Sequence, residues 1–229
     1  MNQVLAAVIL FASLLSFSVS TGTSSSMAQS GTQVPAQANS SHLTSQTPTI
    51  LAEAPLDSNM SGNTKAKYLV LVMTDGQYRI EEEPGPFTGP NWTGTFELQL
   101  LDEKRSPLST LRLNDAFDEL LFQKSFSFAF ADYNHDGNID FAIGQYASSN
   151  LYTYKLFTIR DGKIERLPIE SDNEIVSSER SYSVLFAQVS PDSFKTVYYD
   201  NSLGKYLERV YQWKNTTFSL IREAETDSL

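Results

Sequence analysis

The sequence predicts an all-β domain built from antiparallel hairpins, and two observations support this prediction. Large and small residues alternate with period two over short segments, most plainly from Ser125 to Ala131, where three phenylalanines fall on one face of a strand. Tight turns separate such segments, for example at Asp161-Gly162. We therefore expect a small propeller-like domain of hairpins, with a twisted β-sandwich as the alternative.

Period-two segments recur through the second part of the chain, and helix is nearly absent. The hairpin around Asp161 resembles the hairpin around Asn215 at a spacing of 54 residues, which is near a propeller blade length. Asp75-Gly76 predicts a further two-residue turn. A short helix is expected over Asn114 to Phe122, with Asn114 or Asp115 as its N-cap. The expected strands span Tyr68–Met73, Gln77–Glu81, Gly94–Leu101, Leu108–Leu113, Ser125–Ala131, Ile139–Ile143, Leu151–Arg160, Lys163–Leu167, Tyr182–Val189, Phe194–Tyr199, Tyr206–Trp213 and Thr217–Ile221.

Residues 1–28 have the pattern of a secretory signal peptide. The apolar run from Val4 to Val19 is too short to span a bilayer comfortably, and small polar residues follow it. We expect cleavage after Ala28, although no Lys or Arg precedes the apolar run. The chain is therefore expected to be secreted, in an extracellular or periplasmic location, with membrane attachment only if the segment stays uncleaved.

Residues 29–65 are expected to form a disordered, Ser/Thr-rich linker. From Thr21 to Ile50, thirteen of thirty residues are Ser or Thr, and no aromatic residue occurs between Phe17 and Tyr68. Such a stretch buries too little apolar area to offset the entropy lost on ordering. Residues 66–229 hold all later aromatic residues and are expected to form one β-rich domain.

The composition excludes several functional classes. The chain has no Cys and two His, so it has no disulfide, no thiolate zinc site and no histidine-rich metal cluster. Its net charge of -10 favours neither nucleic acid nor an anionic membrane surface as a partner. It also has no Gly-x-Ser-x-Gly elbow and no phosphate-binding glycine loop. We therefore expect no enzymatic activity.

One segment carries a specific chemical motif, which runs from Asp132 to Asp140. Oxygen-bearing side chains occupy alternate positions of this nine-residue loop, and Gly137 permits a sharp turn. Calcium prefers hard oxygen ligands, so the spacing predicts a Ca²⁺ site, with Asn138 contributing its main-chain carbonyl. The predicted metal ligands are Asp132, Asn134, Asp136, Asn138 and Asp140.

An EF-hand is disfavoured, because its twelfth position requires a bidentate Glu and is Ile143 here. The segment from Phe130 to Gly144 instead resembles the calcium loop of FG-GAP and VCBS-type repeats, known from integrin α-subunit propellers and many secreted bacterial proteins. Gln145-Tyr146 departs from that pattern, and the loop occurs once rather than several times. The resemblance therefore implies a single-copy, secreted bacterial form of such a domain.

We expect this domain to act as a binding or interaction module at or outside the cell surface, for an unidentified protein or glycan. Two alternatives remain open, namely an inhibitor of a cell-wall hydrolase and a carbohydrate-binding module. Glu83 to Trp92 is the candidate loop for plugging an enzyme cleft.

His135 is expected to face solvent without a functional role. Six tyrosines could form a recognition face, although alternating tyrosines are usually half-buried sheet residues: Tyr146, Tyr152, Tyr154, Tyr198, Tyr199 and Tyr206.

Overall fold

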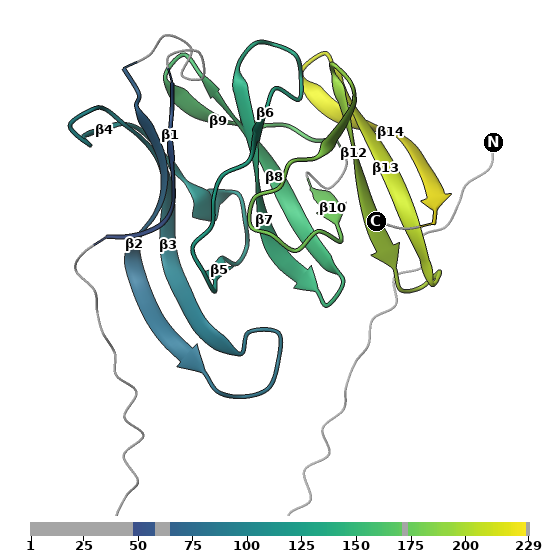
Figure 1. Cartoon of the computed structure of the whole chain (residues 1–229), viewed down its shortest axis with the longest axis horizontal. Helices are drawn as coiled ribbons and strands as arrows, with labels where there is room; N and C mark the ends of the chain where they lie inside the picture. The colour runs from purple at the N-terminus through teal and green to yellow at the C-terminus, as the bar shows by residue number, and fades with distance from the viewer. Residues whose placement is uncertain (1–47, 58–64, 171–173, 228–229) are drawn as a thin grey trace, which may run out of the picture. The chain divides into compact units, whose positions relative to one another are not determined.

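The computed structural model describes residues 48–57, 65–170 and 174–227 and shows an all-β fold. Its strands form three antiparallel sheets, which lie side by side in Figure 1. Sheet A holds β1 (Thr49–Pro55), β2 (Tyr68–Glu81), β3 (Gly89–Leu101), β4 (Pro107–Arg112) and β5 (Leu121–Phe122). Sheet B holds β6 (Phe130–Ala131), β7 (Ile139–Ser148), β8 (Leu151–Arg160), β9 (Lys163–Leu167) and β10 (Ile175–Ser177). Sheet C holds β11 (Ala187–Ser190), β12 (Ser193–Asp200), β13 (Lys205–Lys214) and β14 (Thr217–Thr226).

Sheet B is the middle layer, because each of its faces packs against a separate hydrophobic cluster. Phe141 and Ile143 of β7 join the cluster that sheet A covers. Ala142, between them, joins the cluster that sheet C covers together with Phe194 and Phe218. Successive side chains of a strand point to opposite faces, so both faces of β7 must be apolar here. This explains why the sequence from Phe141 to Ile143 has no polar residue.

The all-β prediction is confirmed, and most expected strands are present. Asp161 and Gly162 both adopt positive φ and join β8 to β9, as the two-residue turn requires. Asn215 joins β13 to β14 in the corresponding position, also with positive φ. The expected propeller is not shown by the described residues, in which three open sheets lie side by side as layers. The three packed sheets fit the sandwich-like alternative.

The expected start of the domain at residue 66 is wrong, because β1 lies inside the segment assigned to the linker. Its apolar residues pack in the core under sheet A, and β1 pairs along β2. Sequence reasoning missed this strand because Ser and Thr dominate the residues before it, while only a few small apolar residues mark it. The rest of the expected linker before residue 48, and the signal segment, lie outside the described residues.

Four further predictions of local structure are wrong. Of the strand expected over Ser125–Ala131 only Phe130–Ala131 forms, as β6, because the phenylalanines pack in the core while the backbone meets single partners, Leu51 and Ser183, instead of a continuous neighbouring strand. Of the strand expected over Tyr182–Val189 only the end forms, as part of β11 (Ala187–Ser190).

In place of the helix over Asn114 to Phe122, a single 3-10 turn spans Leu113–Asp115, and β5 then begins at Leu121. Asp75-Gly76 is not a turn, because β2 continues through it with a bulge. Gly76 instead lies opposite Gly94, where the backbones approach so closely that a Cβ would lie 2.3 Å from the oxygen of Thr93. The two glycines therefore allow the backbones of β2 and β3 to approach closely and do not form a chain reversal.

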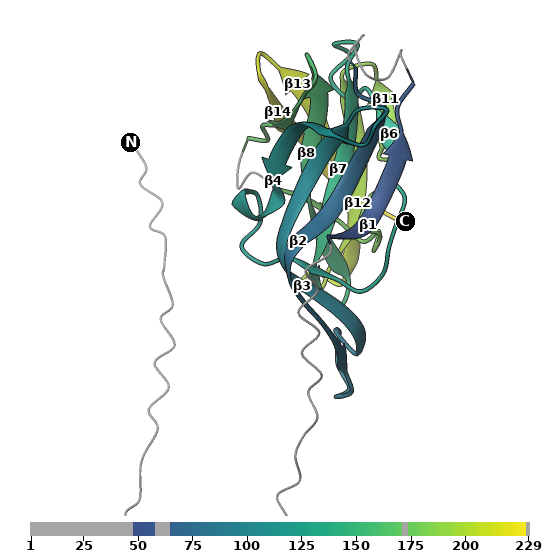
Figure 2. The ribbon, with the colours of Figure 1, turned by 90° about the vertical axis from the view of Figure 1, so that its left-hand side faces the viewer.

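Beyond this point β2 and β3 continue as a long hairpin arm, with β5 paired to β3 at Thr93 and Trp92, as Figure 2 shows in side view. Tyr78 and Trp92 pack together across the arm with their ring centroids 4.9 Å apart. Within the described residues, no helix is long and apolar enough to cross a membrane.

The contribution of β1 can be tested with a pair of neighbouring substitutions. Leu51 is 2% exposed and Ile50 is 46% exposed. We expect Leu51→Ala to lower the free energy of unfolding by about 2–4 kcal/mol, because it leaves a cavity in the core. Ile50→Ala, the control, is expected to change it by less than about 1 kcal/mol. Urea unfolding of both variants measures the difference, and equal effects would show that β1 does not belong to the core.

Candidate metal centre

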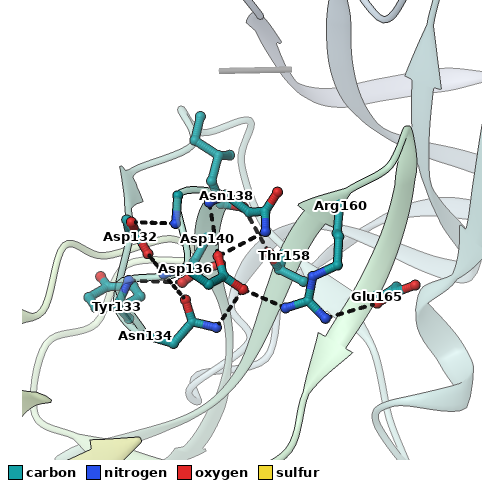
Figure 3. Close-up of polar contacts among 11 residues, drawn as sticks. Asp132, Tyr133, Asn134, Asp136, Asn138, Asp140, Thr158, Arg160 and Glu165 are labelled. Atoms are coloured by element: carbon teal, nitrogen blue, oxygen red, sulfur yellow. Dashed lines mark hydrogen bonds and ion pairs between the residues drawn. The ribbon is translucent and has the colours of Figure 1, made fainter. Parts of the chain in front are cut away.

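The predicted calcium loop joins β6 to β7 at the edge between sheets B and C. It begins at Asp132, immediately after β6, and closes at Asp140, the second residue of β7 (Figure 3). Two of its residues, His135 and Gly137, adopt positive φ of 56° and 82°. These left-handed positions bend the chain tightly, so that the side chains of alternate residues lie on the inside of the loop. The His135 side chain is exposed, in agreement with the expectation that it faces solvent.

Asp132 caps the turn from its first position. Its Oδ1 accepts the N–H of Asp136 at 3.1 Å, and its Oδ2 accepts the N–H of Gly137 at 3.0 Å. Its main-chain oxygen accepts a hydrogen bond from the Nε2 of Gln188 at 2.7 Å, which ties the loop to β11 of sheet C. Both carboxylate oxygens of Asp132 are therefore directed into the loop.

Asp136 is the most heavily hydrogen-bonded ligand candidate. Its Oδ1 accepts two hydrogen bonds from Asn138, through the main-chain N–H and Nδ2, each at 2.9 Å. Its Oδ2 accepts Asn134 Nδ2 at 3.0 Å and Arg160 Nη2 at 2.5 Å, the latter visible in Figure 3. Partial burial raises the pKa of Asp136, but these hydrogen bonds outweigh burial and hold the pKa below its ordinary value.

Asp140 differs from the other carboxylates because its side chain is fully buried. Its Oδ2 accepts the N–H of Tyr133 at 2.8 Å, while its Oδ1 has no hydrogen-bond partner. The Thr158 hydroxyl, on the neighbouring strand β8, donates to the oxygen of Ile139 at 3.3 Å.

The electrostatic surroundings of Asp140 are unfavourable for an anion. Burial raises its pKa to about 7, against the opposing effect of nearby hydrogen-bond donors, and the charges of Asp136 and Asp132 raise it further. A buried carboxylate oxygen without a partner costs free energy unless a donor or a cation meets it. The loop therefore contains an unsatisfied oxygen that faces two further carboxylates.

The two asparagines complete the loop. Asn134 is 5% exposed, and its Oδ1 accepts the N–H of Asp136 at 3.2 Å. The Asn138 side chain turns toward Asp136, which leaves the Asn138 main-chain oxygen as its candidate ligand, as the sequence predicts. All five predicted ligands thus belong to one loop, in which Asp132 and Asn134 are each hydrogen-bonded to Asp136.

The described residues do not form a finished metal site. Among them, no group of three or more His, Cys, Asp or Glu side chains lies close enough to hold a metal ion as it stands. The geometry explains this, because Asp136 is turned toward Arg160 and Asp140 is held back by Tyr133. The donor set nevertheless fits calcium, since it offers only oxygens and leaves one buried carboxylate oxygen unsatisfied.

Sequence reasoning missed two residues that position the loop. Arg160, at the end of β8, places a cation beside Asp136 and also lies 3.7 Å from Glu165. Tyr133, between two ligand candidates, is fully buried, and its hydroxyl accepts the N–H of Phe186 at 2.9 Å. The sequence does not indicate either contact, because Arg160 lies 24 positions from Asp136 and Phe186 lies 53 positions from Tyr133.

Two of the six tyrosines of the proposed recognition face do not belong to an exposed surface. Tyr154 and Tyr198 are buried, whereas the other four are half-buried. The candidate inhibitory loop packs back onto the domain, because Phe87 contacts the ring of Tyr146 at 5.2 Å and Gln123 donates to the oxygen of Thr88. The tip of the arm is thereby fixed against the end of β7.

Comparison of the chain with protein-family models, with curated proteins and with solved structures gives no match. The resemblance to FG-GAP and VCBS-type loops therefore rests on the residues from Phe130 to Gly144 alone.

The anchoring role of Tyr133 can be tested by removing its hydroxyl. Tyr133→Phe leaves the N–H of Phe186 without its acceptor in a buried position, so we expect the free energy of unfolding to fall by about 1–3 kcal/mol. Tyr78→Phe, on the exposed arm, is the matched control and should leave stability unchanged. Thermal or urea unfolding measures both, and a neutral Tyr133→Phe would mean that this hydrogen bond does not hold the loop.

Proposed function

We propose that this chain is a secreted calcium-binding β-domain that acts as a binding or interaction module at or outside the cell surface. The ion orders the loop between β6 and β7 and so stabilises the edge where sheets B and C meet. Asp132, Asn134, Asp136, Asp140 and the main-chain oxygen of Asn138 hold it. The likeness of this loop to FG-GAP and VCBS-type calcium loops supports the same assignment.

The single observation that carries the proposal is the Oδ1 atom of Asp140, which is buried and has no hydrogen-bond partner. Arg160 supplies one positive charge beside Asp136, whereas burial and the charges of Asp136 and Asp132 oppose the ionisation of Asp140 by raising its pKa to about 7. A doubly charged cation that prefers oxygen would stabilise the ionised carboxylates and satisfy the orphaned atom.

Binding requires a small rearrangement within the loop. Asp136 must give up at least one of its hydrogen bonds to offer an oxygen to the ion, and its contact with Arg160 is exposed to solvent. Exposed ion pairs contribute only about 0–1 kcal/mol, so this exchange costs little. Calcium tolerates flexible geometry and six to eight ligands, whereas magnesium demands an octahedral shell. The loop therefore favours calcium.

Calcium should raise the thermal stability of the domain. Extracellular calcium modules bind with a Kd on the order of 0.1–1 mM, and a tenfold excess of ion over Kd then adds about 1.4 kcal/mol to the free energy of unfolding. We expect the Tm to rise by several degrees in calcium and less in magnesium, with chelator restoring the lower value. Scanning calorimetry and titration calorimetry check this, and an unchanged Tm together with no binding heat would refute the proposal.

Asp140→Asn should separate the two effects of the buried carboxylate. The substitution removes a ligand charge, so the calcium-dependent gain in Tm should disappear. In chelator the variant should be at least as stable as the wild type, because an amide is cheaper to bury than a carboxylate that faces two others. Asp161→Asn removes the same charge from the turn between β8 and β9 and serves as the control. Retention of the full calcium response by Asp140→Asn would remove the basis of the assignment.

A further inference from the structure

A second feature lies at the opposite end of β7 from the calcium loop. Three connections meet there, namely the tip of the β2–β3 arm, the β7–β8 turn and the β12–β13 turn, all at the lower end of Figure 1. Asn150 and Asn201 join the last two turns through a hydrogen bond of 2.8 Å. These connections bring half-buried aromatic residues from three sheets to one end of the domain.

Arg180 stands between two open hollows at this end. One has a volume of about 520 Å³ and the other about 290 Å³, which together match the size of small-ligand sites. Arg180 is the one charged side chain among the described residues that line them. The first hollow is lined by Gly85, Pro86, Tyr146, Ser149, Tyr152 and Arg180. The second is lined by Asn150, Ser178, Arg180, Tyr199 and Tyr206.

The backbone on both sides of Arg180 is held by a buried tyrosine. The hydroxyl of the buried Tyr154 hydrogen-bonds to the main-chain oxygens of Glu179 at 2.5 Å and Ser181 at 3.0 Å. Gly144 makes room for this ring, since a Cβ there would lie 2.3 Å from Tyr154 Cε1. The exposed guanidinium donates one hydrogen bond, from Nη1 to the oxygen of Ser149 at 3.1 Å. Within the described residues it forms no ion pair, so its other N–H donors can meet a ligand.

The aromatic walls are similarly held. Tyr146 packs edge-on against Tyr152, with centroids 6.2 Å apart, and against Phe87 of the arm. Across Arg180, Tyr199 packs edge-on against Tyr206 at 5.0 Å. The positive charge of Arg180 opposes the rise in pKa that burial causes at Tyr152, which reflects how near the two groups lie. The site is therefore preformed, and binding would cost little ordering entropy.

We infer that the two hollows on either side of Arg180, together called the groove, bind a glycan segment. In this segment an acidic sugar carrying a carboxylate is flanked by neutral sugars. Arg180 offers a planar, charged fork that matches a carboxylate. The half-buried tyrosines on either side would pack the exposed parts of their rings against the C–H faces of neutral sugars and offer their hydroxyls to the sugar hydroxyls. The inference deepens the proposed binding module by naming its ligand class, and it rests on that proposal.

Charge and shape favour a glycan over an acidic peptide. The domain carries a net charge of -10, so a ligand with many negative charges would be repelled, whereas a single carboxylate at Arg180 would not. A peptide also needs an apolar anchor pocket or a free strand edge. The enclosed space beside the first hollow, behind Tyr146 and Tyr182, is only about 40 Å³ and is too small for such an anchor. The edge strand β10 ends three residues before Arg180, so a peptide probe is included in the test.

The test is titration calorimetry of the full mature chain in calcium with four probes. A hyaluronan tetrasaccharide alternates acidic and neutral sugars and should bind. Chitotetraose, which is entirely neutral, should bind at least tenfold more weakly, and so should tetragalacturonate, which is entirely acidic. A tetraglutamate peptide should not bind. Equal binding of the hyaluronan and chitin fragments, binding of the peptide alone, or no binding of any probe would each overturn the inference.

Variants locate the binding in the groove. Arg180→Gln should weaken hyaluronan binding about tenfold or more, because it removes a charge-assisted hydrogen bond. Arg180→Lys, which keeps the charge but loses the fork, should give an intermediate affinity. Tyr206→Ala should weaken binding about threefold to tenfold. Arg112→Gln, on β4 of sheet A, removes the same charge elsewhere and should bind as the wild type does, so an equal loss in this control would overturn the inference.

Failure of the groove and failure of the calcium proposal give different results. No calcium ligand candidate lines the groove. Absence of glycan binding with an intact calcium-dependent Tm shift would overturn this inference alone. Glycan binding that Arg180→Gln abolishes, in a domain whose Tm does not respond to calcium, would support the groove and overturn the metal assignment. In either case, the unchanged melting of Arg180→Gln confirms that the variant is folded.

Discussion

The burial of sheet B on both faces is the constraint on which the rest of the structure depends. Because sheets A and C cover its two faces, the middle of β7 and β8 is mostly apolar, and the buried Lys155 at the centre of β8 is paired with Glu174. Asp140 therefore lies at the start of β7, and Tyr146 and Tyr152 lie at the other end of the β7–β8 hairpin. As a result, the calcium loop lies at one end of the β7–β8 pair and the hollows beside Arg180 lie at the other.

At the start of β7, burial makes the charge of one carboxylate in a turn-forming sequence unfavourable. Asn and Asp favour turns through hydrogen bonds to their own backbone, and Asp132 and Asp136 do so here. An ordinary turn needs nothing more. Asp140 is different, because β7 carries it into the space between two layers, where its Oδ1 finds no donor. This unpaired oxygen distinguishes the loop from a surface turn, because a bound cation would satisfy it.

At the second end, close packing rather than charge organises the surface. Gly144 lets the ring of Tyr154 lie against β7, and the hydroxyl of that ring fixes the segment that bears Arg180. The apolar core thus positions a charged, exposed side chain through one buried tyrosine. Asn150 and Asn201 then link the turns of sheets B and C, so the two hollows beside Arg180 keep their spacing.

The sequence by itself determined the all-β class, the Asp161-Gly162 turn and the alternating oxygens from Asp132 to Asp140, because these depend on local periodicity and backbone preference. Only the tertiary structure decided that β1 belongs to the core, that Asp75-Gly76 continues a strand, and that Arg160 pairs with Asp136. It also decided which tyrosines are buried and which surround Arg180. Each of these depends on contacts between distant residues, and the packing of three sheets, rather than any local pattern, selects those contacts.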